Sequence, residues 1–338
     1  MDGIKKFHIL VSALLVVCVL LVACSNEKAI ENSKGPIIIR VATVQPDNHS
    51  ITIALNKMKK YIESESDNKY EVRIFGNGVM GGNSETLELL QFDTLDLVAT
   101  SGSNLELYSD AYKIFGIPYL FKDERSFRKV MQNEEFVNKI YNSTLNANIK
   151  GVQWFANGVN NFYSPKKIEN AEDLKGLKVR VQASEANVNM VRGFDAAAVV
   201  LAYGEVYTAL QNKVIDVGTN PETALVQMKH GEVAKYYSKT EHQIFTDILI
   251  ANTKFLDRIK EDKDLFENAY KLVNEVQVKE WDKQIQNLRA EAIEMGVEFI
   301  DVDKTSFIEA QKPVRDKLLA SSEELQNLFK LVQKIQGE

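Results

Sequence analysis

One arginine lies inside a stretch that otherwise has the pattern of a buried β-strand. The stretch is LKGLKVRVQ, residues 174–182, in which Val179 and Val181 flank Arg180. In an extended chain the two valines share one face and the arginine takes the other. Because a guanidinium stays charged in a protein, it needs water, an internal acidic partner or an anionic ligand. The sequence leaves these three alternatives open.

Residues that could catalyse a reaction do not form a known catalytic pattern in this sequence. It has no GxSxG nucleophile elbow and no GxxxxGK[ST] phosphate loop. The histidines lack metal-binding spacing; they are His8, His49, His230 and His242. The sequence therefore predicts no metal, no cofactor and no enzymatic activity, and a secreted hydrolase is the remaining catalytic alternative.

The overall composition is that of an ordinary globular protein. The chain has 338 residues, of which 45% are hydrophobic and 26% are charged, and this length suffices for two domains. Its formal net charge is −6, and it contains no basic tract. Nucleic acid is therefore not an expected partner.

The N-terminus has the pattern of a bacterial export signal. Two lysines precede an apolar run over residues 9–23, and LVAC, which ends at Cys24, matches the lipobox of bacterial lipoproteins. We expect residues 1–23 to be a signal peptide, Cys24 to be lipidated and residues 24–36 to form a flexible tether. An uncleaved anchor helix is the alternative. Because Cys18 would leave with the signal peptide, the exported body would contain no free thiol. The expected location is extracytoplasmic, in the periplasm or at the cell surface, with a lipid anchor in the membrane.

Beyond the tether, strand-like and helix-like segments alternate. Helical spacing is expected at 53–64 and at 84–91, with Ser84 as the N-cap of the second helix. The alternation predicts an α/β fold with mostly parallel sheets and helices on both faces. Strands are expected at 37–44, 70–76, 95–100, 149–155, 177–182, 214–219 and 244–251.

The C-terminal third has a helical pattern. Apolar residues recur every three to five positions over residues 263–295, and Gly296 is a typical stop signal. One helix of roughly thirty residues would be about 50 Å long, enough to brace two domains. The alternative is a pair of helices that break near Trp281. A final helix is expected over residues 305–336, with an interruption at Pro313.

Six segments, taken in order, resemble the DctP-like extracytoplasmic solute receptors of TRAP transporters. The ordered set is specific, and the resemblance covers nearly everything from Ile37 to the end of the chain. The segments are GNGVMGGNSETLELLQ, DTLDLVATSGSNL, FGIPYLFKD, EDLKGLKVRVQ, YGEVYTALQNKVIDVGTNP and EVAKYYSKTEH.

The resemblance implies a two-lobed, periplasmic-binding-protein-like clamshell with a long helix that crosses both lobes. Residues 37–157 and 246–285 are expected in the first lobe, and residues 158–245 and 286–338 in the second. The implied function is to bind a small organic acid between the lobes, to close over it and to deliver it to TRAP membrane permease subunits. The receptor is expected to be a monomer. A clamshell that presents its ligand to a membrane kinase is the alternative.

The resemblance also implies which residues bind the ligand. Arg180 matches the arginine that pairs with the ligand carboxylate, and a planar guanidinium offers two parallel donors that lysine lacks. Asn220 stands where members with asparagine hydrogen-bond the same carboxylate, although it could instead be a plain N-cap before Pro221. Tyr203 matches an aromatic ring that packs against the ligand, and a core position is the alternative.

Further implied positions are less charged than in many members of the family. Asn160 replaces a second arginine, and Ser101 aligns near an acidic residue of some members. Trp154 could face a ligand ring or belong to the core. Asn48 and His49 follow the first strand, where such folds bind ligands. Fewer formal charges favour a hydroxylated monocarboxylate, such as a sugar acid, over a dicarboxylate.

Overall fold

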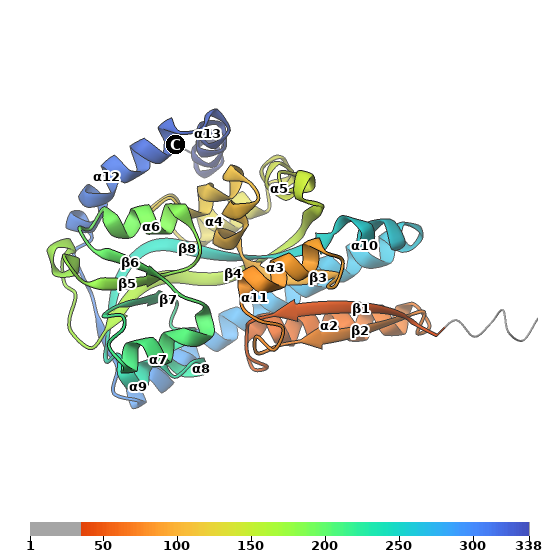
Figure 1. The fold of residues 1–338 in the computed structure, drawn as a ribbon, viewed down its shortest axis with the longest axis horizontal. Coiled ribbons are helices and arrows are strands. Elements are labelled where there is room, and N and C mark those ends of the chain that lie inside the picture. Colours follow the sequence, from red (N-terminus) through yellow and green to blue (C-terminus); the bar gives the residue numbers. More distant parts are fainter. Residues whose placement is uncertain (1–34, 338) are drawn as a thin grey trace, which may run out of the picture.

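The computed structural model describes residues 35–337 and has a mixed α/β fold (Figure 1). The strands are β1 (Ile37–Thr43), β2 (Tyr70–Phe75), β3 (Leu97–Ser101), β4 (Ile149–Ser164), β5 (Lys178–Val181), β6 (Ala197–Val200), β7 (Gly218–Asn220), β8 (Tyr236–Asn252) and β9 (Glu298–Ile300). The helices are α2 (Ser50–Glu65), α3 (Asn83–Gln91), α4 (Glu124–Met131), α5 (Glu134–Asn142), α6 (Glu185–Arg192), α7 (Val206–Gln211), α8 (Thr223–Gln227), α9 (His230–Val233), α10 (Thr253–Arg258), α11 (Lys263–Glu294), α12 (Thr305–Ala320) and α13 (Glu323–Gln336). Three short 3₁₀ helices matter for the site: η1 (Gly102–Leu107), η2 (Asp110–Gly116) and η5 (Tyr203–Glu205).

The main sheet is mixed rather than parallel throughout. Its strand order is β2-β1-β3-β8-β4-β7, with β9 beside β8. β1 pairs in parallel with β2 and β3, and β5 pairs in parallel with β6 in a separate small sheet. β8 is antiparallel to β3 and β4, and β4 is antiparallel to β7. The predicted parallel pairing is therefore confirmed for β1 with β2 and β3, for β5 with β6 and for β8 with β9, whereas the pairs among β3, β8, β4 and β7 are antiparallel.

The two central strands are much longer than the sequence pattern suggests. β4 has 16 residues and β8 has 17, whereas apolar runs predict only residues 149–155 and 244–251. The ladder between them shifts register between Ala156 and Val159, where polar residues also interrupt the apolar pattern. Because both strands continue past this bulge, they connect the half of the molecule around β1 to the half around β7 (Figure 1).

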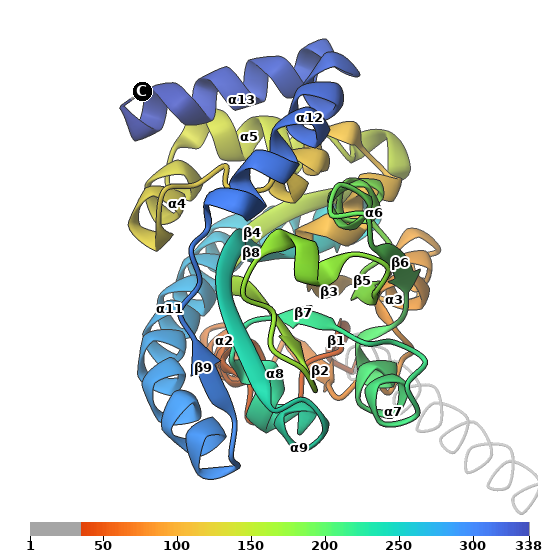
Figure 2. The ribbon, with the colours of Figure 1, turned by 90° about the vertical axis from the view of Figure 1, so that its left-hand side faces the viewer.

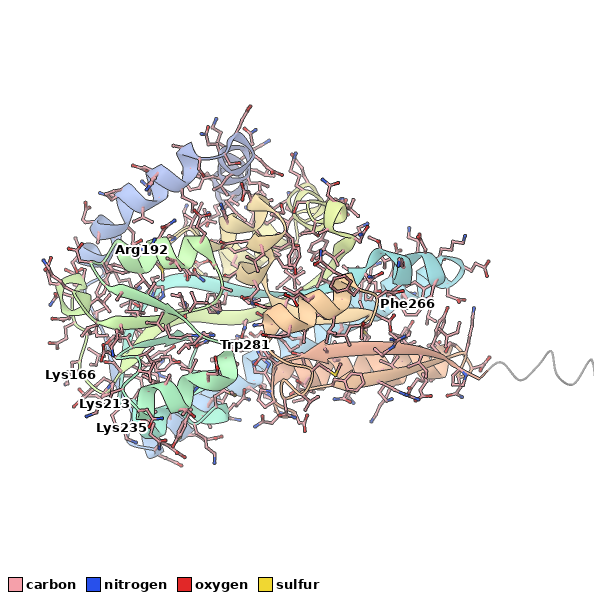
Figure 3. All side chains as sticks on the ribbon, viewed as in Figure 1. Lys166, Arg192, Lys213, Lys235, Phe266 and Trp281 are labelled. Atoms are coloured by element: carbon pink, nitrogen blue, oxygen red, sulfur yellow. The ribbon has the colours of Figure 1, made fainter. Side chains whose placement is uncertain are left out.

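The long helix is continuous and crosses the whole molecule, as predicted. α11 has 32 residues and contacts α2, β4 and α8 in turn (Figure 2). Phe266, near its start, packs in the core with β1 and α2, and Ala292, near its end, packs with residues of α7. Trp281 lies buried between them (Figure 3). Gly158 admits the indole, because a Cβ at this residue would lie 2.3 Å from a ring carbon of Trp281. A break near Trp281 is therefore wrong.

Two predictions about helix ends are wrong. α3 begins at Asn83 with Gly82 as its N-cap, so Ser84 lies inside the helix. Pro313 lies inside α12 without ending it, and the helix ends instead at Ala320. Ser322 then starts α13, because its hydroxyl accepts a hydrogen bond from the backbone N–H of Leu325 at 3.3 Å.

The last helix packs on elements that the sequence analysis assigns to the first lobe. Leu325, Leu328 and Val332 of α13 share a core cluster with Phe127 of α4 and Phe136 of α5. The predicted assignment of this helix to the second lobe therefore does not describe its packing. The other lobe boundaries stay a prediction.

The expected signal peptide, residues 1–23, and the expected lipidation site Cys24 lie outside the described residues, as does most of the tether. Among residues 35–337, no helix is both long and apolar enough to cross a membrane.

Candidate functional site

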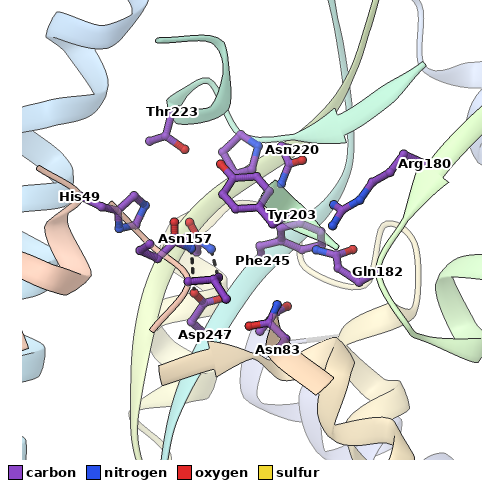
Figure 4. A pocket seen from close by; sticks show the side chains of 14 residues that line it. His49, Asn83, Asn157, Arg180, Gln182, Tyr203, Asn220, Thr223, Phe245 and Asp247 are labelled. Carbon is purple, nitrogen blue, oxygen red and sulfur yellow. Dashed lines mark hydrogen bonds between the residues drawn. The ribbon is translucent and has the colours of Figure 1, made fainter. Parts of the chain in front are cut away.

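A polar cavity lies where the two long strands meet the ends of the shorter ones (Figure 4). The space between its lining residues is about 420 Å³ and includes solvent at its open mouth. Its lining comes from both predicted lobes, which is the arrangement expected of a clamshell cleft. The lining residues are Val44, Gln45, His49, Asn83, Ser101, Asn157, Arg180, Gln182, Tyr203, Asn220, Pro221, Thr223, Phe245 and Asp247.

Five of the residues predicted from the sequence line this cavity together. Arg180 comes from β5, Asn220 from β7, Tyr203 from η5, Ser101 from the end of β3, and His49 from the loop before α2. These elements are far apart in the sequence, and the fold brings their ends to one place. These five residues, predicted from the sequence to bind the ligand, therefore lie around one cavity.

Three other predicted residues lie elsewhere. Trp154 is buried in the core, with its ring edge-to-face to Phe127 at 5.7 Å between centroids. Asn48 is exposed, and its backbone carbonyl accepts hydrogen bonds from two glutamine side chains. Asn160 is buried and donates to Gln243 at 3.3 Å, outside the cavity lining. The side chains of β4 near its bulge thus point away from the cavity, with the exception of Asn157.

Arg180 is buried without a counter-ion. Its side chain is among the largest fully buried ones, and no carboxylate among residues 35–337 forms an ion pair with it. Nε and Nη2 both donate to the carbonyl of Leu201, at 3.1 and 2.9 Å, whereas Nη1 is buried without a partner in the protein. Burial lowers the pKa of Arg180, and the nearby Tyr163, Tyr203 and Glu205, none of which forms an ion pair with it, oppose this shift. Two of the three alternatives, a solvated edge and an internal ion pair, are therefore excluded.

The free edge of the guanidinium faces the cavity. Because the Nε side is used by Leu201, Nη1 and the second hydrogen of Nη2 remain, and together they match the two oxygens of a carboxylate. The Tyr203 ring lies 5.9 Å from the guanidinium carbon of Arg180 and closes one side of the cavity. The geometry thus prepares Arg180 for an end-on, bidentate contact with an anion.

Asn220 is held so that its amide NH₂ is available. The hydroxyl of Tyr163 donates to Asn220 Oδ1 at 3.2 Å and lies 2.8 Å from His230 Nδ1. Since a hydroxyl has one proton, His230 must donate in that second contact, and burial lowers the pKa of His230 to about 3, which keeps it neutral. Gly218 admits the tyrosine ring, because a Cβ there would lie 2.3 Å from it. Glu222, not Asn220, is the N-cap of α8, so the plain N-cap alternative is wrong.

Three neutral acceptors in the cavity also lack partners in the protein. They are Gln45 Oε1, Asn83 Oδ1 and Ser101 Oγ, all buried. Buried polar atoms in native proteins are almost always hydrogen-bonded, so such a cluster around one cavity indicates a ligand that supplies the donors. Hydroxyl groups of a ligand would satisfy all three atoms.

Asp247 lies in the same cavity and was missed by the sequence analysis. It is only 2% exposed, and its carboxylate accepts hydrogen bonds from Asn157 Nδ2 at 3.1 Å and Gln45 Nε2 at 3.5 Å (Figure 4). Burial raises the pKa of Asp247 to about 6. A signal was present: Asp247 interrupts the apolar run IFTDILIA just as Arg180 interrupts its own strand. Gln45 also followed a strand end, whereas Asn157 and Thr223 carried no comparable signal.

No group of three potential metal-ligating side chains occurs in the part of the chain that the structure describes. His49 is used structurally, because its Nδ1 accepts a hydrogen bond from the Ile51 backbone N–H at 3.2 Å at the start of α2, and burial lowers its pKa to about 3. The arrangement therefore suits reversible binding of an anion that carries hydrogen-bond donors.

Comparisons with known proteins also indicate a protein that binds a solute. Residues 41–322 match the family model described as "Bacterial extracellular solute-binding protein, family 7". An uncharacterized protein of Salmonella typhimurium is 34% identical over 90% of this chain and 92% of its own length. A protein of Vibrio cholerae named C4-dicarboxylate-binding periplasmic protein DctP is 29% identical over 78% of this chain and 79% of its own.

Solved structures share the whole fold. A TRAP periplasmic solute-binding protein of Anaerococcus prevotii with bound D-glucuronate has a TM-score of 0.87 and 36% identity, and covers 88% of this chain and 98% of its own. One from Xanthobacter autotrophicus with bound β-D-galacturonate has a TM-score of 0.84 and 26% identity, and covers 88% and 99% of the two chains.

Proposed function

Because the chain belongs to family 7 of the bacterial extracellular solute-binding proteins, we propose that it binds hydroxylated monocarboxylates, such as hexuronates, as the solute receptor of a TRAP transporter. The observation that carries the proposal is the buried guanidinium of Arg180, which has no counter-ion and faces the cavity with its free edge. An unpaired buried charge is costly, so it persists where a ligand supplies the opposite charge. The bound glucuronate and galacturonate of the two related structures support this choice of ligand.

The charges in the cavity favour one carboxylate over two. Among the described residues that line the cavity, Arg180 is the single cationic side chain, and the other polar groups are amides, hydroxyls, a neutral imidazole and one acid. A dicarboxylate would leave its second carboxylate without a cation. A relative in Vibrio cholerae is named for C4-dicarboxylates, and the charges in this cavity favour a different class of ligand for the present chain.

Ligand binding would be coupled to closure of the two lobes. In this structure Glu106 of η1 accepts hydrogen bonds from Ser184 Oγ at 2.7 Å and from the Ala186 backbone N–H at 3.1 Å. Lys113 of η2 pairs with Glu185 at 2.7 Å. These contacts join the predicted first lobe to the start of α6 in the predicted second lobe. Closure would shift the population toward a form that the membrane subunits distinguish from the open one.

We propose further that the receptor is exported and held at the membrane by lipid on Cys24. The support is the N-terminal pattern of lysines, an apolar run and LVAC. Incorporation of radiolabelled palmitate by the wild type and its loss in Cys24→Ser would agree with this anchor, whereas equal labelling of both would contradict it.

A thermal-shift panel tests the proposed ligand class. We expect D-glucuronate, D-galacturonate or D-gluconate to raise the melting temperature by several degrees, since a ligand at 100 times its Kd adds about 2.7 kcal/mol of stability. Succinate and malate serve as the comparison. Stabilisation by these dicarboxylates, with none by any sugar acid, would overturn the proposal.

A further inference from the structure

We propose that Asp247 is the residue that selects the uncharged, hydroxylated end of the ligand and rejects a second carboxylate there. The inference rests on the proposed function, because it assumes that the ligand carboxylate binds Arg180. It adds a specificity-determining residue at the other end of the same cavity.

The two charged side chains of the cavity stand apart. Arg180 enters from β5, and Asp247 lies on β8 at the opposite side, with Phe245 and Tyr203 between them (Figure 4). No ion pair joins the two within the described part of the chain. A ligand that spans the cavity would therefore meet a cation at one end and an acid at the other.

Asp247 is fixed in place but not saturated. The amides of Asn157 and Gln45 each donate one hydrogen bond to it, one to each carboxylate oxygen. A carboxylate can accept about four hydrogen bonds, so acceptor capacity remains on the cavity side. Gln45 uses its NH₂ for Asp247 and leaves Oε1 without a partner, which places a second free acceptor beside the acid. Two adjacent hydroxyls of a sugar acid would match these two acceptors.

The surroundings of Asp247 leave its charge uncompensated. Tyr203 and His49 are the other titratable groups that line this end, and burial raises the pKa of the tyrosine and lowers that of the histidine, so both are neutral at pH 7. Arg180 is held on the far side by the Leu201 carbonyl. In such a water-poor site a second ligand carboxylate next to Asp247 would be strongly repelled.

Titration calorimetry on the purified protein tests the proposal with three acids. D-glucuronate tests the proposed function, and D-gluconate and D-glucarate test Asp247, because these two open-chain acids differ only in a terminal hydroxymethyl or carboxylate group. We expect the wild type at pH 8 to bind gluconate at least about 100-fold tighter than glucarate. In Asp247→Asn the ratio should fall to about 10-fold or less. The change Asp257→Asn, at an exposed residue of α10, is the matched control and should keep the wild-type ratio.

Acidification offers the same test without a mutation. Because the pKa of Asp247 is about 6, its carboxyl is mostly protonated at pH 5. We therefore expect wild-type discrimination against glucarate to weaken at least several-fold between pH 8 and pH 5, and Asp247→Asn to show no such change.

The outcomes separate the inference from the proposed function. If the wild type binds none of the three acids, the proposed function fails. If glucuronate binds but Asp247→Asn keeps the wild-type preference, or if both proteins reject gluconate and glucarate equally at both pH values, the role of Asp247 is overturned while the function stands.

Discussion

Within residues 35–337, the region around Asp96 and the cavity bury charge in opposite ways. In the predicted first lobe, Asp96 is 0% exposed, and its carboxylate accepts hydrogen bonds from the Arg40 backbone N–H at 2.7 Å and from the Arg258 guanidinium. Arg258 also pairs with Asp93 at 3.1 Å. In the cavity, Arg180 and Asp247 are equally buried, yet neither has a counter-ion.

The difference indicates what each place is for. A buried charge with its counter-ion and hydrogen bonds in place stabilises the fold, and removing one partner leaves the other uncompensated. A buried charge without a counter-ion lowers stability until a ligand compensates it. Substitutions in the ion-pair cluster around Asp96 should therefore change stability alone, whereas substitutions of the cavity charges should change ligand affinity. The following variants test this separation.

Arg180→Lys is expected to have the largest effect. The charge stays, but lysine cannot offer two parallel donors to a carboxylate, so we expect affinity for D-glucuronate to fall about 100-fold or more. Thermal stability without ligand should hardly change, since Arg180 has no ion pair to lose. Calorimetry against Arg258→Lys, which keeps its charge far from the cavity, provides the control. Unchanged affinity in Arg180→Lys would contradict the role of the cavity charges in binding.

Asp96→Asn is expected to have the next largest effect, and on stability alone. Breaking a buried pair costs about 3–5 kcal/mol, but the Arg258 side chain is 38% exposed and can be hydrated, so we expect a loss of about 2 kcal/mol. Urea unfolding measures this loss, and titration with glucuronate should show wild-type affinity. A large loss of affinity with little loss of stability would contradict the proposed separation.

Tyr163→Phe is expected to have the smallest effect, and it should change both ligand affinity and stability. Without the hydroxyl, Asn220 loses the contact that orients its amide, so we expect affinity to fall about 5- to 10-fold and stability to fall by about 1 kcal/mol. Tyr112→Phe removes a buried hydroxyl that has no partner, away from the cavity, and should change neither property. Equal effects of the two variants would argue against a role for Tyr163 in positioning Asn220.

Most of the fold could be predicted because its elements have simple periods. The β1–β3 strands and α11 match their predicted positions closely, since apolar runs and helical spacing directly express burial. The lengths of β4 and β8 could not be predicted, because a bulge and polar residues around Gly158 interrupt the strand pattern. The break between α12 and α13 was assigned to proline, although the serine cap at Ser322 decides it.

The site could be predicted only in part for a related reason. Arg180 was identifiable because a lone charge in an apolar strand has few explanations. Asp247 is likewise a lone charge in an apolar run, IFTDILIA, and so carried the same signal. It was not identified, because an aspartate near the start of an apolar run is also typical of a strand end. Asn157 faces the cavity because of the bulge in β4, and three-dimensional irregularity of this kind leaves no period in the sequence.

A crystal structure of the protein with D-glucuronate tests the central claim most directly. We expect the two carboxylate oxygens within hydrogen-bond distance of Nη1 and Nη2 of Arg180 and of the Asn220 amide, with sugar hydroxyls on the Asp247 side. A carboxylate bound elsewhere, or Arg180 still without an anionic partner in the complex, would contradict the account.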